Sequence, residues 1–498
     1  MPGGTSAADV DPPRPNADRR CGCPRRGVLG AVWSRGKCRL RCRPPGMLLI
    51  WWTASGSFIP PSSPAFRNMS MRQLSPVWAI CLAITATVSW PSLAGRAAAQ
   101  DWPGFHGPSG LGQTSGALPD GWTDSDYVWK VNLGSTDVGS VAIADGRVFL
   151  LTFDESRHSL ALVALELGSG KELWRRLLPI GEYHRHKRNT YASSTPTVDG
   201  DSVYVAYADS DHTWLRSFSV EGQEQWARDF GPWQSDHGFA TSPRVAGGLV
   251  VLYDSQQADQ LEPGQTPSHE RMIAVDAATG ADKWETELKP TRTNYSVPAY
   301  YTTPAGTAQV IGSGTGNGVF GIDAKTGEKL WELPVIDKRS VGSPLIIGDL
   351  ALASCGSGGG GNVVVAVKIP ASAEDSPKEV YRIDRSASYV PTPAVDGDQM
   401  MMVSDNGILS RVRLSDGATV WSNRLGGNYG ASPIVIGNKT LVISLDGIAT
   451  IVANADRFEK LGEVDLGAGV GASPAAGGGK LLVRVGEELR CLSIEKSL

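Results

Sequence analysis

One short motif recurs along most of the sequence and limits what the chain can fold into. In its clearest copy, Ile273 to Leu288, an apolar strand runs into Asp-Ala-Ala-Thr-Gly, and a second strand carrying Trp284 leaves the turn. Further copies end at Trp174, Trp226, Trp331 and Trp421. The Gly of each copy can supply the positive φ that a tight hairpin needs. A repeat of roughly 40 to 50 residues with this strand–turn–strand pattern predicts four-stranded propeller blades.

Two markers count the repeats. The aromatic position is filled by Trp129, Trp174, Trp226, Trp284, Trp331, Tyr381 and Trp421, with Leu461 as a weaker eighth member. A small residue followed by Pro opens a strand at 195–196, 242–243, 297–298, 343–344, 392–393, 432–433 and 473–474, and residues 139–142 occupy the same place without Pro. These markers predict an all-β, eight-bladed β-propeller. Seven blades remain the alternative if the Leu461 unit is irregular.

The order of the markers predicts how the ring closes. Trp129 precedes the first strand-opening marker, and no Trp strand follows the last one. Segments 481–484 and 489–494 would therefore supply inner strands of a last blade whose outer strand is 128–133. A blade shared by both ends of the chain removes exposed sheet edges. We expect the aromatic residues of the repeat to pack between blades.

The N-terminal part differs from the repeats. Residues 1–68 carry 11 Lys/Arg against 3 Asp and four of the seven cysteines, and we interpret them as disordered or as preceding the true start, with Met1, Met69 and Met71 as candidate starts. Residues 69–99 resemble a secretory signal peptide, with a basic residue, an apolar run too short for a membrane span, and Ala-Ala-Ala before Gln100. Residues 100–125 form a Gly/Pro-rich lead-in, expected to cross the ring and bury Trp102 and Phe105. Residues 126–498 form the propeller.

These features give expectations about the compartment and the partners. The chain should be exported, to the periplasm or outside the cell, without a membrane span after processing, and should be a monomer without a nucleic-acid partner. Export permits disulfides, but Cys355 and Cys491 lie about three blades apart and are expected to be separate buried thiols. The glycine run 356–361 precedes a strand rather than a helix, which argues against a phosphate-binding loop.

Candidate site residues lie in the polar segments just before the Pro markers. They are His184, His186, Tyr191, His237, Arg292, Tyr295, Arg339, Tyr389 and Tyr429. In a propeller these segments meet around the central channel. Three interpretations remain open: hydrogen-bonding residues that hold the loops, a rim that binds a small polar ligand or a partner protein, and a catalytic or metal site. The cations beside His184 and His186 disfavour a metal ion, so none is expected.

The motifs Ala-x-Asp-x-x-Thr-Gly-x-x-x-Trp at 274–284 and 321–331 resemble the repeat of pyrroloquinoline quinone (PQQ) propellers. With Trp102-Pro-Gly-Phe-His-Gly-Pro108 and Asn189 to Pro196, the chain is similar to secreted bacterial PQQ-like proteins of unestablished function. A more distant resemblance is to the propeller lipoprotein of the outer-membrane β-barrel assembly machinery. The quinone enzymes use a vicinal Cys-Cys pair and a calcium-binding set, and neither can be matched here. The resemblance therefore implies a non-catalytic binding or scaffold propeller without cofactor. The alternative is a PQQ- and calcium-dependent oxidoreductase with its cofactor at the channel mouth.

Overall fold

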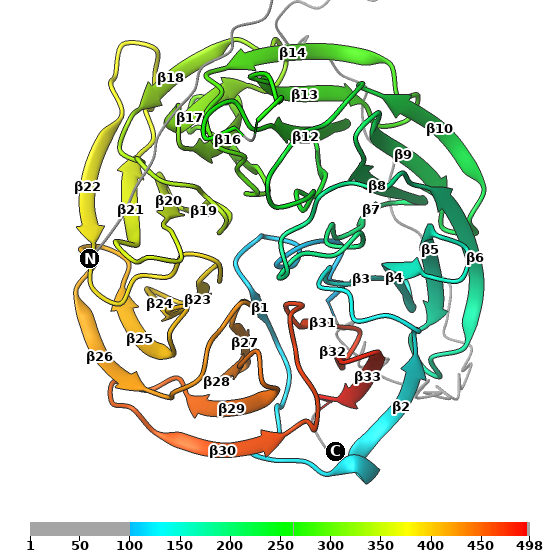
Figure 1. Ribbon diagram of the computed structural model, residues 1–498. Coiled ribbons are helices and arrows are strands. Elements are labelled where there is room, and N and C mark those ends of the chain that lie inside the picture. Colours follow the sequence, from blue (N-terminus) through cyan, green and yellow to red (C-terminus); the bar gives the residue numbers. More distant parts are fainter. Residues whose placement is uncertain (1–99, 262, 496–498) are drawn as a thin grey trace, which may run out of the picture. The chain divides into compact units, whose positions relative to one another are not determined.

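The computed structural model describes residues 100–261 and 263–495, and these form eight sheets arranged as the blades of a propeller (Figure 1). The predicted signal peptide and the segment 1–68 lie outside the described residues. Within them, helical structure is limited to one 3-10 turn, η1 (Asp124–Asp126). The prediction of an all-β, eight-bladed propeller is confirmed.

Blades 1 to 7 each run from an innermost to an outermost strand in chain order. Blade 1 holds β3 (Ala142–Ala144), β4 (Arg147–Asp154), β5 (Ser159–Glu166) and β6 (Glu172–Pro179). Blade 2 holds β7 (Thr197–Asp199), β8 (Ser202–Ala208), β9 (Thr213–Ser219) and β10 (Glu224–Asp229). Blade 3 holds β11 (Arg244–Ala246), β12 (Leu249–Ser255), β13 (Glu270–Asp276) and β14 (Asp282–Leu288). Blade 4 holds β15 (Ala299–Thr302), β16 (Ala308–Gly314), β17 (Gly318–Asp323) and β18 (Lys329–Leu333).

The second half of the ring repeats this order. Blade 5 holds β19 (Leu345–Ile347), β20 (Leu350–Cys355), β21 (Val363–Lys368) and β22 (Lys378–Ile383). Blade 6 holds β23 (Ala394–Asp396), β24 (Gln399–Val403), β25 (Ile408–Arg413) and β26 (Thr419–Arg424). Blade 7 holds β27 (Ile434–Ile436), β28 (Lys439–Ile443), β29 (Ile448–Ala453) and β30 (Lys460–Asp465), and β1 (Gln113–Thr114) pairs with β27 in parallel.

Blade 8 closes the ring with strands from both ends of the chain. It holds β31 (Ala475–Gly477), β32 (Lys480–Val485) and β33 (Glu488–Ser493), and its outermost strand is β2 (Tyr127–Asn132). Trp129 pairs with Cys491 in this antiparallel register. The predicted closure by a shared blade is therefore present.

The repeated Trp joins each blade to the next. The Trp174 indole N–H donates to the Val220 carbonyl of blade 2 at 2.9 Å, and its ring lies against Gly222, where a Cβ would come within 2.7 Å of it. The same pairing joins Trp129 to Gly170, Trp226 to Gly280 and Trp284 to Gly327. We call each pair a Trp–Gly clasp. The glycine of the motif is thus required twice, for its positive φ and for the absence of a side chain.

Trp331 departs from this pattern. The corresponding turn of blade 5, between β21 and β22, contains no glycine. Its indole N–H donates instead to Gln309 of its own blade at 2.8 Å. Tyr381 of blade 5 and Trp421 of blade 6 contact the following blades, through Gly417 and the Ala455 carbonyl respectively.

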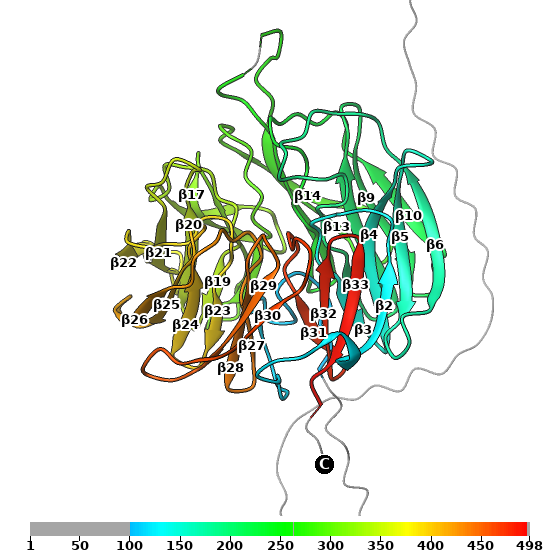
Figure 2. The ribbon, with the colours of Figure 1, turned by 60° about the horizontal axis from the view of Figure 1, so that its bottom comes forward.

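The lead-in crosses the ring on one side (Figure 2). Its backbone bonds to innermost strands in turn: Trp102 to Ile143 of blade 1, Pro103 to Val198 of blade 2, Leu111 to Val395 of blade 6, and Gly112 to Val435 of blade 7. The side chain of Trp102 is fully buried. The lead-in therefore closes one end of the central channel, and the long loop between β12 and β13 rises on the other side.

The remaining cysteines behave as the spacing predicted. Cys355 and Cys491 are both free and buried. No helix of the described ranges has the length and apolar character needed to cross a bilayer.

Candidate functional site: the channel mouth

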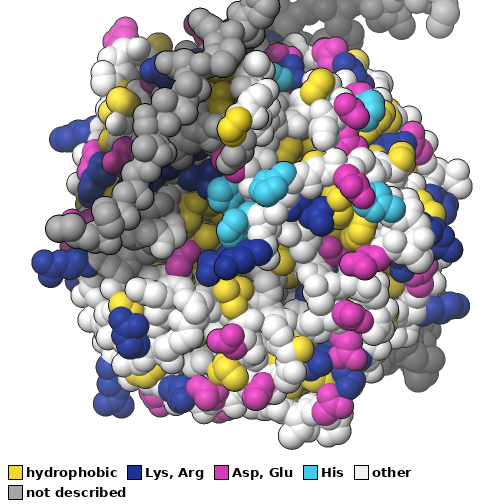
Figure 3. Space-filling view, viewed as in Figure 1, with side chains coloured by type: hydrophobic (Ala, Val, Ile, Leu, Met, Phe, Trp, Pro, Cys, Tyr) yellow, Lys and Arg dark blue, Asp and Glu magenta, His cyan; other side chains and the backbone are white. Residues whose placement is uncertain are grey.

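A cavity of about 1120 Å³ opens at the channel mouth on the face shown in Figure 1. Its wall is built from the eight returns, by which we mean the segments that connect the outermost strand of one blade to the innermost strand of the next. Its lining also includes Phe105 of the lead-in. Histidine, lysine and arginine side chains gather near the middle of this face (Figure 3). The returns are therefore brought together as the sequence predicted, and the lead-in supplies part of the floor.

The small residue before each Pro has a specific role in this cavity. The backbone N–H of Thr195 donates to the Ser242 hydroxyl at 2.9 Å. At the equivalent position of the other blades, the backbone N–H of one residue donates in the same way to the hydroxyl of the next: Ser140 to Thr195, Val297 to Ser343, Ser343 to Thr392, Thr392 to Ser432 and Ser432 to Ser473. The Ser140 hydroxyl closes the circle on the Ser473 carbonyl at 2.8 Å. We call this ring the hydroxyl belt. The belt is interrupted at blade 4, because Val297 has no hydroxyl that could accept the backbone N–H of Ser242.

A buried ion pair fixes the seam between blades 8 and 1 at the cavity wall. Arg484 and Asp137 are 2% and 3% exposed and lie 3.2 Å apart. Arg484 also donates to the carbonyls of Gly139 and Leu151 at 3.1 and 2.9 Å. Asp137 accepts from the Phe153 N–H at 3.0 Å and from the Thr152 hydroxyl at 3.1 Å. These bonds hold both charged groups in place and leave only the Arg484 Nε–H of the pair without a partner among the described residues, so this part of the wall is structural.

The returns into blades 2 to 5 form a sector rich in donors. Arg339 donates its Nε to the Thr293 carbonyl at 2.9 Å and a terminal nitrogen to His237 Nε2 at 3.0 Å. Burial and then the nearby Arg339 lower the pKa of His237 to about 4, so its ring is neutral at pH 7. Since Nε2 accepts, the proton lies on Nδ1, which is buried and has no hydrogen-bond partner among the described residues. The His186 ring stacks on the His237 ring, with 4.9 Å between the two ring centroids.

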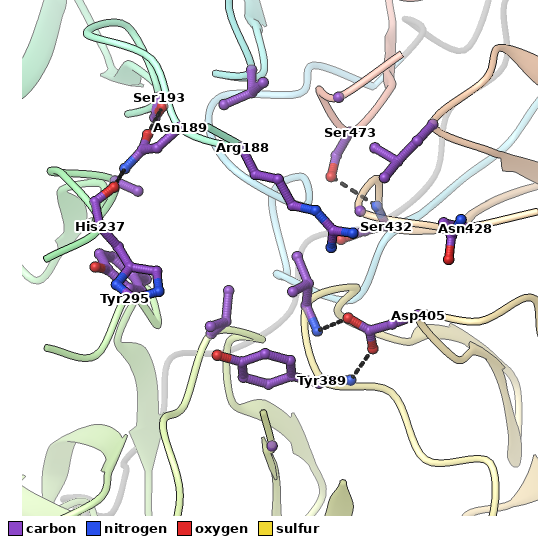
Figure 4. Close-up of a pocket in the computed structure, with 18 of the residues that line it drawn as sticks. Arg188, Asn189, Ser193, His237, Tyr295, Tyr389, Asp405, Asn428, Ser432 and Ser473 are labelled. Atoms are coloured by element: carbon purple, nitrogen blue, oxygen red, sulfur yellow. Dashed lines mark hydrogen bonds between the residues drawn. The ribbon is translucent and has the colours of Figure 1, made fainter. Parts of the chain in front are cut away.

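The opposite part of the wall carries Asp405. Its carboxylate accepts the backbone N–H groups of Tyr389 and Val390 at 2.9 and 3.3 Å, and burial raises its pKa. Arg188 extends from the return into blade 2 toward the middle of the opening, on the side that carries Asp405 (Figure 4). Over the whole cavity, five Lys or Arg side chains face three Asp side chains. The cavity is therefore net basic.

Comparisons with known proteins place this geometry in a family. The family model described as outer membrane protein assembly factor BamB, one of the PQQ-like repeat models, matches residues 159–423, more than half of the chain. The chain belongs to the PQQ-like propeller family. No curated protein matches it.

Solved structures share the fold at low identity. BamB from Moraxella catarrhalis is 13% identical with a TM-score of 0.52, covering 75% of this chain and 98% of that one. Quinohemoprotein alcohol dehydrogenase from Comamonas testosteroni is 15% identical with a TM-score of 0.56, covering 80% and 81%. A europium-containing methanol dehydrogenase is 11% identical with a TM-score of 0.55, covering 79% and 98%. At such identities the likeness shows the PQQ-like propeller fold alone.

The side chains at the mouth of this PQQ-like propeller do not fit a quinone with calcium. In residues 100–261 and 263–495, no three His, Cys, Asp or Glu side chains are grouped to hold a metal ion. Asp137 is tied to Arg484, and Asp405 is occupied by two backbone N–H groups. The two cysteines of this part of the chain lie in different blades rather than side by side.

The structure places the nine candidate site residues in three settings. Six of them line the cavity: His186, His237, Arg292, Tyr295, Arg339 and Tyr389. Tyr295 is nevertheless 9% exposed, and its hydroxyl bonds to Ser235 at 2.9 Å. The hydroxyl belt, Arg188 and Asp405 were missed. The Ser/Thr-Pro marker was the available signal for the belt.

Three candidates do not line the cavity. Tyr191 lies in a second, shallower pocket, where it stacks on Phe153 at 4.4 Å beneath Arg185. Tyr429 is 2% exposed in the core between blades 6 and 7. His184 is exposed and lines neither pocket. Tyr191 and Tyr429 therefore act in packing.

Proposed function

We propose that this PQQ-like propeller is an exported, non-catalytic binding module that holds a ligand or a segment of a partner protein in its channel mouth. The observation that carries the proposal is the cavity itself. Returns from all eight blades build its wall, and it is closed below by the lead-in. A concave pocket with convergent polar groups is the usual form of a binding site.

The neighbouring groups favour binding over chemistry. A general base needs a titratable group within reach of a bound substrate. The acidic side chain nearest to this role, Asp405, already accepts two backbone N–H groups, and His237 Nε2 accepts from Arg339. These hydrogen bonds fix both groups in the cavity wall.

Export of this module rests on the signal-like segment 69–99. The lead-in begins directly after it, at Gln100. A chain cut at that point would keep Trp102 and its whole channel floor.

The alternative is a PQQ- and calcium-dependent oxidoreductase, favoured by the fold shared with the two dehydrogenases. Incubating the purified protein with PQQ, calcium, an electron-accepting dye and a panel of alcohols and sugars tests it. We expect no dye reduction above that of free PQQ. Robust turnover would refute the non-catalytic proposal.

Binding at the mouth is tested with a photo-crosslinking amino acid in the full chain in the producing cells. Position Ser357 lies on the cavity wall, and Leu330 on the outermost strand of blade 4 is the matched exposed control. Intact-mass spectrometry should show a defined adduct at position 357 and none at 330. Equal adducts at both positions, or none at 357, would contradict the proposal.

A further inference from the structure

Two of the cationic side chains that line the cavity lie in neighbouring returns. Arg292 lies in the return into blade 4 and Arg339 in the return into blade 5, and both line the cavity. The Arg339 guanidinium is held by two neutral acceptors, the Thr293 carbonyl and the His237 ring. Its charge is therefore fixed in position without being neutralised by those two bonds. Arginine in such a fixed orientation suits planar oxyanions.

The same sector contains a hydrogen-bond donor that has no partner among the described residues. The buried Nδ1–H of His237 has no partner, and buried donors without partners are rare in folded proteins. The interruption of the hydroxyl belt falls here as well, because Val297 cannot accept from Ser242. Neutral donors in the returns into blades 3, 4 and 5 thus occur together with two cations: Arg339, which is held by hydrogen bonds, and Arg292, which lies 3.8 Å from the partly exposed Asp259 carboxylate.

The wall of this sector also carries hydroxyl groups. Ser242 and Ser343 each accept a backbone N–H through their oxygen, which leaves the hydroxyl hydrogens available to a group in the cavity. Both side chains line it. An anionic oxygen in this sector would have hydroxyl and N–H donors available, whereas a cation would be repelled by the guanidinium groups of Arg292 and Arg339.

Resting on the proposed binding function, we propose that Arg292, Arg339 and His237, together with the hydroxyls of Ser242 and Ser343 in the same cavity, form an oxyanion seat. The seat takes a carboxylate or phosphate group. This group belongs either to a small anion or to an acidic segment of a partner protein. Arg188, which reaches into the opening, adds positive charge at the entrance.

The test uses isothermal titration calorimetry on the full-length protein with succinate, inorganic phosphate and hexaglutamate as probes, and with hexalysine as the oppositely charged control. We expect one-site binding of at least one anionic probe, weakened by added salt. Arg292→Gln and Arg339→Gln should each weaken it roughly 10- to 100-fold, the usual effect of removing a charge-assisted hydrogen bond. Arg175→Gln removes an arginine from outermost strand β6 and should leave the affinity unchanged.

The outcomes separate the sources of the oxyanion. Binding of succinate or phosphate but not hexaglutamate indicates a small anion, and tighter binding of hexaglutamate indicates an acidic protein segment. The seat is refuted if no anionic probe binds at 10 mM, or if Arg292→Gln, which removes a partly exposed side chain, binds as tightly as Arg175→Gln. If a ligand crosslinks at position 357 and the adduct yield is unchanged in Arg292→Gln and Arg339→Gln, the binding function is supported and the oxyanion seat is refuted. Quinone-dependent turnover would remove the proposed function, while anion binding would stand on its own calorimetry.

Discussion

The Trp–Gly clasp predicts a specific difference between two glycines of blade 2. Gly222 has φ of +83° and lies against the Trp174 ring, where an added Cβ would come within 2.7 Å of the indole. Gly200 has φ of +53°, and an added Cβ would meet nothing within 4 Å. Both Gly→Ala changes incur the left-handed backbone penalty, about 1–2 kcal/mol. Only Gly222→Ala adds steric overlap in a packed site, about 1–3 kcal/mol.

The expected result is therefore a further loss of about 1–3 kcal/mol in the free energy of unfolding for Gly222→Ala relative to Gly200→Ala. For a propeller of roughly 400 residues, the unfolding entropy makes this a difference of only about 1–4 °C in Tm. Urea denaturation, read as a shift of the midpoint at constant slope, is the better assay.

A second background isolates the cause. In Trp174→Ala protein the indole is absent, so the cost of Gly222→Ala should fall to that of Gly200→Ala. Equal costs for the two glycines in the wild-type background would refute the clasp as the reason for the motif glycine. So would an unchanged cost of Gly222→Ala once Trp174 is removed.

Three further perturbations have defined outcomes. Arg484→Met should destabilise the protein by about 3–5 kcal/mol, because it leaves the buried Asp137 carboxylate without its cation, and urea unfolding measures the loss. Burial raises the pKa of Glu270 to about 8. The stability that its protonated form provides is therefore complete below about pH 4.5, and the free energy of unfolding falls by about 1.4 kcal/mol per pH unit from there up to pH 8. Glu270→Gln should flatten this slope between pH 6 and pH 8 in urea unfolding. Trp102→Ala should cost about 3–5 kcal/mol and expose the channel floor, seen as faster hydrogen exchange at the Ile143 amide that bonds to the lead-in.

The sequence predicted the ring because its markers recur at backbone positions that the fold must repeat. Asp145-Gly146 illustrates this local determination: both residues have positive φ, as a two-residue hairpin of this kind requires. The position of Trp129 before the first strand-opening marker was sufficient to predict which strands share the last blade.

Side-chain direction in the returns was not predictable in the same way. Tyr389 and Tyr429 each precede their Pro by four residues, yet the first lines the cavity and the second is 2% exposed in the core. Irregular segments have no fixed period that would assign alternate residues to opposite faces, unlike strands. The partners of Arg339 and Arg484 lie in other blades, so their roles depended on the assembled ring.

The closing strand has a consequence for how the chain must fold. Strand β2 is among the first parts of the propeller to be made, and its partner β33 is the last. Until β33 arrives, β2 has no neighbour, and the incomplete ring presents unpaired edges that can associate with other chains. Contacts between such distant parts of a chain form slowly. A truncation after β32 should therefore harm the yield of native protein far more than the loss of one of the thirty-three strands in the described residues suggests.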